Sequence, residues 1–340
     1  MNDTEIKSFK QSFFEGYGKT IKKLDVIRPH RVYVALTDSD CFVVKFLKDA
    51  DTLNWQGKCI QQLLGKETKG VVPFLYNKYH SVVNTFDGQV YGVMPYIPGK
   101  TINLNQSSHI ENSLKLLAHV HRQGGGIFGQ QPAVPFHSKT YVKWRDRFLQ
   151  FKRSVRDAAY QDEPYGGVKS LAHLINCLAD EALDWAERVL DAFPQAYMLY
   201  LEEQAQWERQ IAHQDMAPHN FLVIDDQFFY MIDYDRMSYA PPFLDLIHFI
   251  SMVLPYVRWE YAALGHLLGH YEQYFPLEQE QKRYLPLLLI FPQDVFREWL
   301  GVWRREPGYH PGQVLHYFKE LEHNWDRRRT FVQHCLAVLK

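Results

Sequence analysis

The spacing of apolar residues changes near residue 97, and this change constrains the fold more than any other feature of the sequence. Before it, apolar and β-branched residues form short runs separated by turn residues, which predicts strands. One helical segment, roughly 52–65, interrupts these runs. After Pro98-Gly99 the apolar residues recur at helical spacing. The predicted strands are LDVI at 24–27, RVYVALT at 31–37, CFVVKFL at 41–47 and QVYGVMPYI at 89–97.

A second pair of short apolar runs lies inside the helical half of the chain. The runs 220–224 and 228–233 flank the acidic turn DDQ and predict a hairpin. A five-stranded amino-terminal sheet with one helix, a short connector and a helical region that contains a small hairpin is the element order of the kinase-like fold. We therefore expect an α+β, bilobal, protein-kinase-like fold with a small β-rich lobe at 1–97 and a large helical lobe at 98–340.

Composition excludes several classes of protein. The 340 residues are 46% hydrophobic and 23% charged, as in ordinary globular proteins. The net charge of −1 gives no global field that favours nucleic acid or an anionic membrane surface. No stretch approaches the ~18 apolar residues of a membrane span, and MNDTEIKSFK at the start lacks the apolar core of a signal peptide. We therefore expect cytoplasmic synthesis without export, and no nucleic-acid or membrane partner.

The segment 211–236 contains the residues with the clearest chemical meaning. It reads His213-x-Asp215-x4-Asn220, followed by the predicted hairpin and then Asp233. Phosphoryl transfer needs a carboxylate that orients and deprotonates the acceptor hydroxyl, and oxygen ligands that hold Mg²⁺ against the phosphates. An Asp and an Asn five residues apart on a tight loop can supply the first of each. Asp233, at the end of an apolar strand, can supply the second metal ligand.

Two other interpretations of this segment are open. Asp215 and Asn220 could be turn residues, with Asp233 as the cap of a strand. Alternatively, His213, Asp215 and His219 could bind Zn²⁺ or Fe²⁺ in a metal-dependent hydrolase, because imidazole and carboxylate together suit these ions. The sequence holds no second His/Asp cluster with ligand spacing, so phosphoryl transfer is the favoured interpretation.

The chain resembles the aminoglycoside phosphotransferase and choline kinase superfamily. The resemblance depends on HQDMAPHN at 213–220, IDYDR at 232–236, PPFLDL at 241–246 and the helix LLAHVHRQGG. Within that superfamily, LPLLLIFPQDVFREW at 285–299 is similar to a segment of the CotS-type spore coat kinase-like proteins of endospore-forming bacteria. The resemblance covers roughly residues 15–335.

The resemblance implies roles for individual residues. Asp215 would be the catalytic base, Asn220 and Asp233 the Mg²⁺ ligands, and Lys45 the strand lysine that pairs with the phosphates of ATP. Strand alternation also places Lys45 on one face with Val43 and Leu47, where a ligand could neutralise its charge.

Further roles follow from the same resemblance. The backbone of the connector at Met94 and Tyr96 would contact adenine. His213 and Asp245 would support the catalytic loop. The function implied is ATP- and Mg²⁺-dependent phosphorylation of a small-molecule or protein hydroxyl, with association to the spore coat and possible contacts to other coat proteins.

The sequence departs from the superfamily pattern at three places. The turn VIRPHRVYV at 26–34 contains no glycine. No Glu lies between Lys45 and Glu67 to pair with the lysine, and the expected helix offers only the neutral Gln56 and Gln61. Gln214 occupies a position at which the superfamily often carries Gly. These departures keep an alternative open, in which the protein is a weak or inactive pseudokinase that acts as a structural coat protein.

Aromatic and basic residues of the helical region are expected to be structural. Tryptophans at helical spacing are usually part of a core. The segments WRREPGYHPG and HNWDRRRTF predict a solvated surface, on which Arg304-Arg305 or Arg327-Arg328-Arg329 could bind an anionic partner. The tryptophans concerned are Trp144, Trp185, Trp207, Trp299 and Trp303.

Overall fold

The computed structural model describes residues 3–128, 140–159 and 169–337. The chain divides into two compact units, each of two segments. The first comprises residues 1–135 and 205–245, and the second comprises 136–204 and 246–340. Among the described residues, no helix is both long enough and apolar enough to cross a membrane.

A five-stranded antiparallel sheet forms the centre of the first unit, in the order β1-β2-β3-β5-β4. Four of its strands match the predicted runs, and the fifth, β4, is a short strand that pairs with β5. The hairpins along the chain explain why strands close in sequence are neighbours in the sheet. The strands are β1 Lys23–Arg28, β2 Val32–Leu36, β3 Cys41–Leu47, β4 Asn84–Phe86 and β5 Gln89–Pro95.

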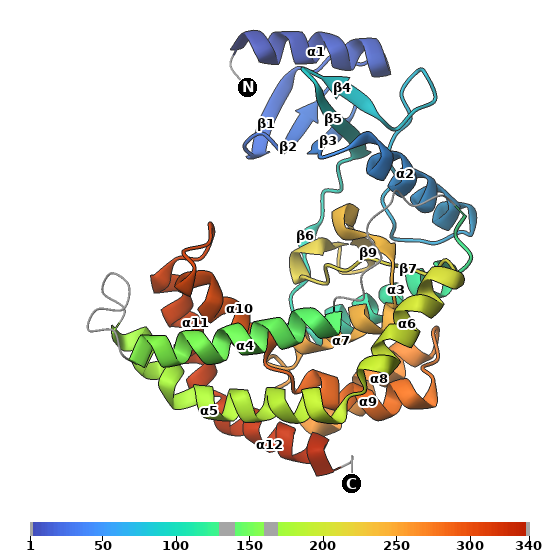
Figure 1. The fold of residues 1–340 in the computed structure, drawn as a ribbon. Coiled ribbons are helices and arrows are strands. Elements are labelled where there is room, and N and C mark those ends of the chain that lie inside the picture. Colours follow the sequence, from blue (N-terminus) through green and yellow to red (C-terminus); the bar gives the residue numbers. More distant parts are fainter. Residues whose placement is uncertain (1–2, 129–139, 160–168, 338–340) are drawn as a thin grey trace. The chain divides into compact units, whose positions relative to one another are not determined.

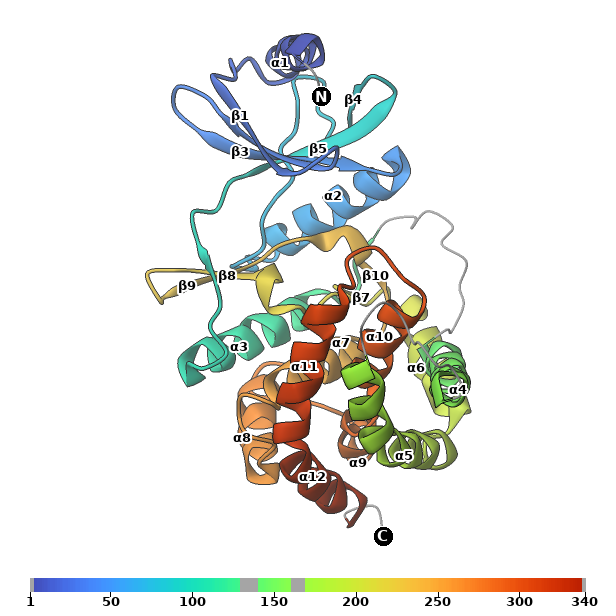
Figure 2. The ribbon, with the colours of Figure 1, turned by 90° about the vertical axis from the view of Figure 1, so that its left-hand side faces the viewer.

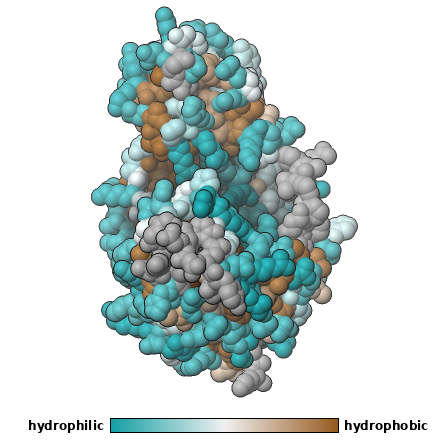
Figure 3. Space-filling view, turned by 60° about the vertical axis from the view of Figure 1, so that its left-hand side comes forward, coloured by the Kyte–Doolittle hydropathy of each residue, from teal (hydrophilic) through white to brown (hydrophobic). Residues whose placement is uncertain are grey.

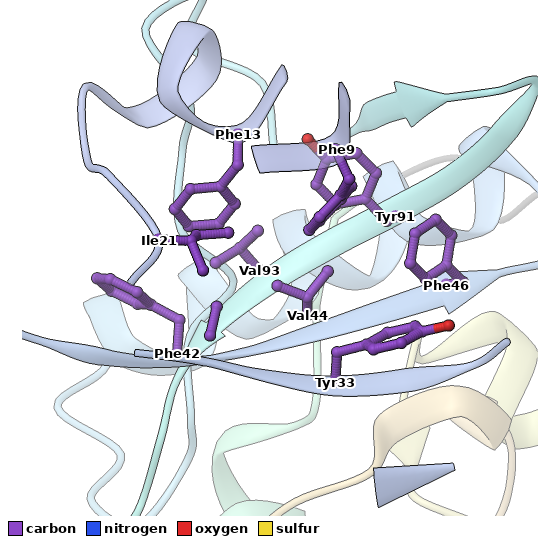
Figure 4. Packing of buried hydrophobic residues seen from close by; sticks show 10 residues of the cluster. Phe9, Phe13, Ile21, Tyr33, Phe42, Val44, Phe46, Tyr91 and Val93 are labelled. Carbon is purple, nitrogen blue, oxygen red and sulfur yellow. The ribbon is translucent and has the colours of Figure 1, made fainter. Parts of the chain in front are cut away.

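Helix α1 (Asp3–Tyr17) covers one face of this sheet, as Figures 1 and 4 show. Phe9 and Phe13 are fully buried and pack on Phe42, Val44 and Phe46 of β3. Burial of each phenyl ring stabilises the unit by roughly 1.5–3 kcal/mol. The sequence predicts one helix in this region, whereas the structure has two. Helix α1 was missed because it has only a narrow apolar stripe in an otherwise polar segment.

The second helix of this region, α2 (Ala50–Gly65), agrees with the predicted helix. Its first turn is capped by Asp49, whose side chain accepts a hydrogen bond from Thr52 N at 2.7 Å. Helix α2 precedes β4 and carries Gln56 on its buried side. The face of the sheet opposite α1 carries Val43 and Lys45, as the alternation along β3 requires.

The predicted hairpin is confirmed as β8 (Phe221–Ile224) and β9 (Phe228–Met231). Asp225 and Asp226 in its turn have φ angles of 51° and 53°, the left-handed conformation that tight hairpin turns require. Figure 2 shows the hairpin beside α3 (Ser107–Gln123). The first unit also contains β6 (Lys100–Thr101), β7 (Ile211–Ala212), β10 (Ser238–Tyr239) and the 3₁₀ turns η1 (Pro218–Asn220) and η2 (Tyr234–Arg236).

The second unit is built from helices. Helices α4 and α5 run side by side (Figure 1), and Phe151 of α4 packs on Phe296 of α10 with ring centroids 4.4 Å apart. The helices are α4 Thr140–Ala159, α5 Lys169–Ala192, α8 Tyr261–Glu272, α9 Gln279–Leu289, α10 Gln293–Trp303, α11 Pro311–His323 and α12 Trp325–Ala337. Two more helices, α6 (Gln195–Trp207) and α7 (Pro242–Val253), cross the boundary between the units.

The predicted core tryptophans are buried at Trp144, Trp185 and Trp299, and Trp303 stacks on Trp299. Trp207 is the exception, because 87% of its surface is exposed. The face of the molecule shown in Figure 3 is mostly hydrophilic with scattered apolar patches.

The prediction that Arg327-Arg328-Arg329 lies on a solvated surface was wrong for Arg328. Its side chain is 2% exposed and makes two hydrogen bonds of 2.8 Å to the carboxylate of Asp294. Its guanidinium also lies over the rings of three tryptophans, at 4.7 Å from Trp259, 5.5 Å from Trp325 and 5.8 Å from Trp185. Three successive residues span more than half of the helix circumference, and here Arg328 lies on the inner face, where a carboxylate and aromatic rings accept it.

Candidate active site

Lys45 on β3 is the buried cation of the first unit. Its side chain is 8% exposed, and Nζ lies 2.6 Å from Asp233 Oδ1 and 2.7 Å from Asp235 Oδ1. These contacts join two segments 188 residues apart in the chain. A lysine buried to this extent needs carboxylate partners or a ligand, and the structure supplies two carboxylates.

Active kinases usually pair the strand lysine with a glutamate of the following helix, but α2 offers an amide instead. Gln56 of α2 is fully buried, and its Nε2 donates a hydrogen bond of 2.9 Å to the carbonyl of Tyr234. Gln61 is exposed. The partners of Lys45 therefore come from the turn that follows β9, and not from the helix.

Asp233 occupies a strained position at the end of the hairpin. Its φ and ψ angles of 66° and 60° lie in the left-handed region, which costs energy for an aspartate and is common at functional sites. Burial acts to raise the pKa of its carboxyl, but the charge and hydrogen bond of Lys45 outweigh burial and hold the pKa below its ordinary value. Asp233 is therefore ionised and able to bind a cation.

Asp215 and Asn220 lie on one tight loop, as their spacing predicts. Asn220 is 1% exposed, and its Nδ2 donates a hydrogen bond of 2.9 Å to the backbone carbonyl of Asp215. Because the amide nitrogen is used in this way, the amide oxygen of Asn220 is left as the possible metal ligand. Asp233 is held close to this loop, because the amide of the preceding Ile232 donates to the carbonyl of Asn220 at 2.9 Å.

The loop is braced by Asp245, which is 2% exposed. Its carboxylate accepts hydrogen bonds from the backbone amides of His213 at 2.6 Å and Gln214 at 2.8 Å. His121 Nε2 lies 3.3 Å from the same carboxylate. Burial acts to raise the pKa of Asp245, yet the hydrogen bond and charge of His121 lower it below the ordinary value.

His213 is buried in the same loop as a neutral imidazole. Its Nε2 lies 2.8 Å from the carbonyl of Ile232, which can only accept, so Nε2 carries the proton. Its Nδ1 accepts a hydrogen bond of 3.3 Å from the amide of Asp215. Burial lowers the pKa of His213, although nearby carboxylates, Asp245 first among them, act in the opposite direction.

We expect the protein to lose stability as the pH falls from 7.5 to 5.5, in part through His213. The unfolded chain binds a proton at this residue near its ordinary pKa of 6.5, whereas the folded chain resists protonation, so acid favours unfolding. Thermal unfolding of wild type and His213→Gln across this range would measure the effect. The variant should show a shallower decline, and equal slopes in the two proteins would contradict the prediction.

Gln214 adopts a φ angle of 63°. This conformation is free of cost only for glycine, so the backbone of Gln214 is strained. The backbone amides of Gln214 and His213 donate hydrogen bonds to the carboxylate of Asp245, and the side chain of Gln214 donates a hydrogen bond to the hydroxyl of Ser238. These contacts compensate for the strain of the left-handed backbone.

The structure does not support the metal-hydrolase interpretation. Both ring nitrogens of His213 are engaged in hydrogen bonds within the loop, and His219 is exposed. Within residues 3–128, 140–159 and 169–337, no group of three or more His, Cys, Asp or Glu side chains could hold a metal ion.

The connector residues occupy the end of β5. Met94 is buried and pairs with Val43 across the sheet. The amide of Tyr96 donates a hydrogen bond of 2.9 Å to the carbonyl of Cys41, and the side chain of Tyr96 is exposed. A contact from Tyr96 to a nucleotide base would therefore use its carbonyl, because the N–H is already engaged.

Asp235 is the site residue that sequence reasoning missed. It lies two residues after Asp233 in the segment IDYDR. The sequence therefore showed the residue, but not its contact with Lys45. Arg31 Nη2 lies 3.9 Å from Asp235 Oδ2, which brings the turn between β1 and β2 to the same cluster of charges.

Comparison with known proteins gives a consistent result. The model of the phosphotransferase enzyme family (APH) matches residues 30–287. A crystal structure of an aminoglycoside phosphotransferase from Alicyclobacillus acidocaldarius is similar with a TM-score of 0.76 and 16% identity, over 94% of this chain and 92% of that chain.

Two ligand complexes are also similar in fold. Spectinomycin phosphotransferase APH(9)-Ia with ADP and spectinomycin has a TM-score of 0.63 and 16% identity, over 93% of this chain and 94% of that chain. Amicoumacin kinase with AMP-PNP and Ca²⁺ has a TM-score of 0.58 and 12% identity, over 97% and 94%. These similarities confirm the predicted bilobal kinase-like fold.

Proposed function

The chain belongs to the phosphotransferase enzyme family, and from this premise we propose that it transfers the γ-phosphoryl group of ATP to a hydroxyl acceptor in a Mg²⁺-dependent reaction. The observation that carries the proposal is the contact of buried Lys45 with Asp233, beside the loop of Asp215 and Asn220. A phosphate-binding cation, two oxygen ligands and a carboxylate base are the groups that this reaction needs.

The residues present fit ATP and Mg²⁺. The carboxylate of Asp233 and the amide oxygen of Asn220 are hard oxygen ligands of the kind that Mg²⁺ prefers. When bound, Mg²⁺ would neutralise charge on the phosphates. Lys45 would pair with the phosphates, and the apolar residues Val43 and Met94 on the same face of the sheet would contact the base.

Asp215 would act on the acceptor. Its half-buried side chain lies on the loop fixed by Asn220, where it can accept the proton of the acceptor hydroxyl. The acceptor oxygen forms a bond to the γ-phosphorus while the bond from that phosphorus to the bridging oxygen breaks, and ADP leaves. His213 and Asp245 hold the backbone of the loop and take no part in the proton transfer.

A small-molecule hydroxyl is the acceptor that we favour over a protein. Spectinomycin is bound in one of the similar structures, which supports a small acceptor without identifying it here. Association with the spore coat, with other coat proteins as partners, is proposed from the resemblance of residues 285–299 alone. Synthesis in the cytoplasm without export likewise remains a prediction. The lobes at 1–97 and 98–340 also remain a prediction, and the compact units of the structure follow other boundaries.

The pseudokinase alternative is weakened by the contacts of Lys45. It depended on the absence of a helix carboxylate to position the lysine. Because Asp233 and Asp235 both lie within 2.7 Å of Nζ, the lysine is positioned by other groups.

We expect ATP and Mg²⁺ together to raise the melting temperature of the purified protein, because a ligand that binds only the folded state stabilises it. At 100 times the dissociation constant the gain is about 2.7 kcal/mol. Differential scanning fluorimetry with ATP, Mg²⁺ and both would measure the shift. Asp233→Asn should lose the Mg²⁺-dependent part, and the absence of any shift in wild type at millimolar ATP would refute the nucleotide site.

A further inference from the structure

We propose that Asp235 is a positioning residue, which takes the place of the helix glutamate and keeps Lys45 oriented toward the phosphates during transfer. This inference rests on the proposed function, because it concerns the lysine of the same site. It assigns a separate task to each of the two aspartates in IDYDR, Asp233 as metal ligand and Asp235 as partner of the lysine.

The argument begins with the charge of a buried ammonium group. Lys45 is 8% exposed and has two carboxylate oxygens within 2.7 Å. When Asp233 turns to a metal ion, the lysine loses one of these partners. With the phosphates as its one further partner, a flexible lysine side chain would be poorly fixed in position. Asp235 is the carboxylate that remains in contact with Nζ.

The turn that carries Asp235 is fixed from helix α2. Gln56 Nε2 donates a hydrogen bond of 2.9 Å to the carbonyl of Tyr234, the residue between the two aspartates. Tyr234 itself is 3% exposed, and its hydroxyl donates to the carbonyl of Met231 at 2.6 Å. Asp235 therefore lies on a short, well-anchored 3₁₀ turn, which suits a residue that must hold a neighbour in place.

Gln56 cannot replace the missing charge itself. Its side chain is neutral and fully buried, and among the described residues its Oε1 has no hydrogen-bond partner. The helix thus supplies an amide that holds the turn, and the turn supplies the carboxylate that holds the lysine. The substitution Asp235→Glu would keep the carboxylate on the turn, which makes a comparison with a conservative variant possible.

Two other roles for Asp235 are less favoured by the geometry. Its contact with Arg31 is 3.9 Å and the Arg31 side chain is 58% exposed, so this ion pair is weak. As a metal ligand Asp235 is less well placed than Asp233, which directly follows the residue, Ile232, whose amide bonds the carbonyl of Asn220, the other proposed ligand.

The test compares ATP hydrolysis, with water as acceptor, in wild type, Asp235→Asn and Asp235→Glu. We expect Asp235→Asn to lower kcat by about 10- to 100-fold, as for a misplaced catalytic group. The KM for ATP should change less than about threefold, because the substitution is expected to affect the transfer step and not the binding of ATP. Asp235→Glu keeps the charge and changes the length of the side chain, so it should retain more of kcat than the isosteric Asp235→Asn, a result that a merely structural role of Asp235 would not give.

Several outcomes would overturn the inference. A kcat for Asp235→Asn within about twofold of wild type would do so. So would a loss that excess Mg²⁺ restores, since that identifies a metal ligand. An Asp235→Glu variant that melts normally but has a kcat no higher than that of Asp235→Asn would also overturn it. A wild type that binds Mg²⁺ and ATP, with Asp235→Asn equal to it in kcat, would overturn the positioning role alone, whereas a wild type that binds neither ligand would overturn the proposed function as well.

Discussion

Replacing Asp215 with asparagine is expected to lower the rate of ATP turnover by about 10²- to 10⁴-fold, the usual contribution of a general base. Asparagine has the shape of aspartate but cannot accept the proton of the acceptor hydroxyl. The loop should keep its conformation, because Asn220 contacts the backbone carbonyl of Asp215 and not its side chain. Arg236 Nε, at 4.0 Å from the Asp215 carboxylate, is too distant for a strong pair.

Binding should separate this variant from the variants of the metal site. The thermal shift with ATP and Mg²⁺ is expected to persist in Asp215→Asn, since the nucleotide ligands are unchanged. Asp225→Asn in the hairpin turn is the matched control, because it makes the same substitution at a position where asparagine tolerates the left-handed backbone. Turnover by Asp215→Asn equal to that of the control would exclude Asp215 as the base.

The sequence was most informative where the site is local. Asp215 and Asn220 share one loop, and the short hairpin of β8 and β9 carries the chain from that loop to Asp233. Spacing within a short segment fixes such geometry, so a motif of this kind can be interpreted without a structure. Asp245, which binds the backbone of the loop, is also close to it in the chain, because its helix α7 follows soon after the hairpin.

The partners of Lys45 could not be predicted in this way. The lysine is 188 residues from Asp233 and 190 residues from Asp235, and the sequence shows only that the expected helix lacks a glutamate. Whether the absence leaves the lysine without a partner depends on which face of the turn at Asp235 meets the sheet. That is decided by tertiary packing, to which spacing along the chain gives no access.

Arg328 illustrates a second limit of the sequence. Charge runs usually lie in solvent, and the neighbours of Arg328 conform, since Arg327 is exposed and Arg329 pairs with Glu181 at the surface. A helix nevertheless turns by 100° per residue, so three successive residues cannot share one face. Trp185, Trp259 and Trp325 then surround the inward arginine.

Replacing Arg328 with methionine is expected to lower the free energy of unfolding by about 3–5 kcal/mol, the cost of removing one partner from a buried ion pair. Methionine keeps much of the apolar volume between the tryptophans but leaves the Asp294 carboxylate with neutral hydrogen-bond donors, the hydroxyl of Tyr317 at 2.7 Å and the backbone of Val295. Arg328 holds the pKa of Asp294 at about 2 against the effect of burial, so its removal uncovers an unpaired carboxylate.

Urea unfolding of Arg328→Met and of Arg327→Met would measure this effect with a control one residue away. Arg327 is exposed, and its replacement should change the free energy of unfolding by less than about 0.5 kcal/mol. Adding Asp294→Asn to Arg328→Met should recover part of the loss, because the uncompensated charge is then gone. Equal and small effects of the two arginine variants would mean that the buried pair contributes nothing beyond the packing of its neighbours.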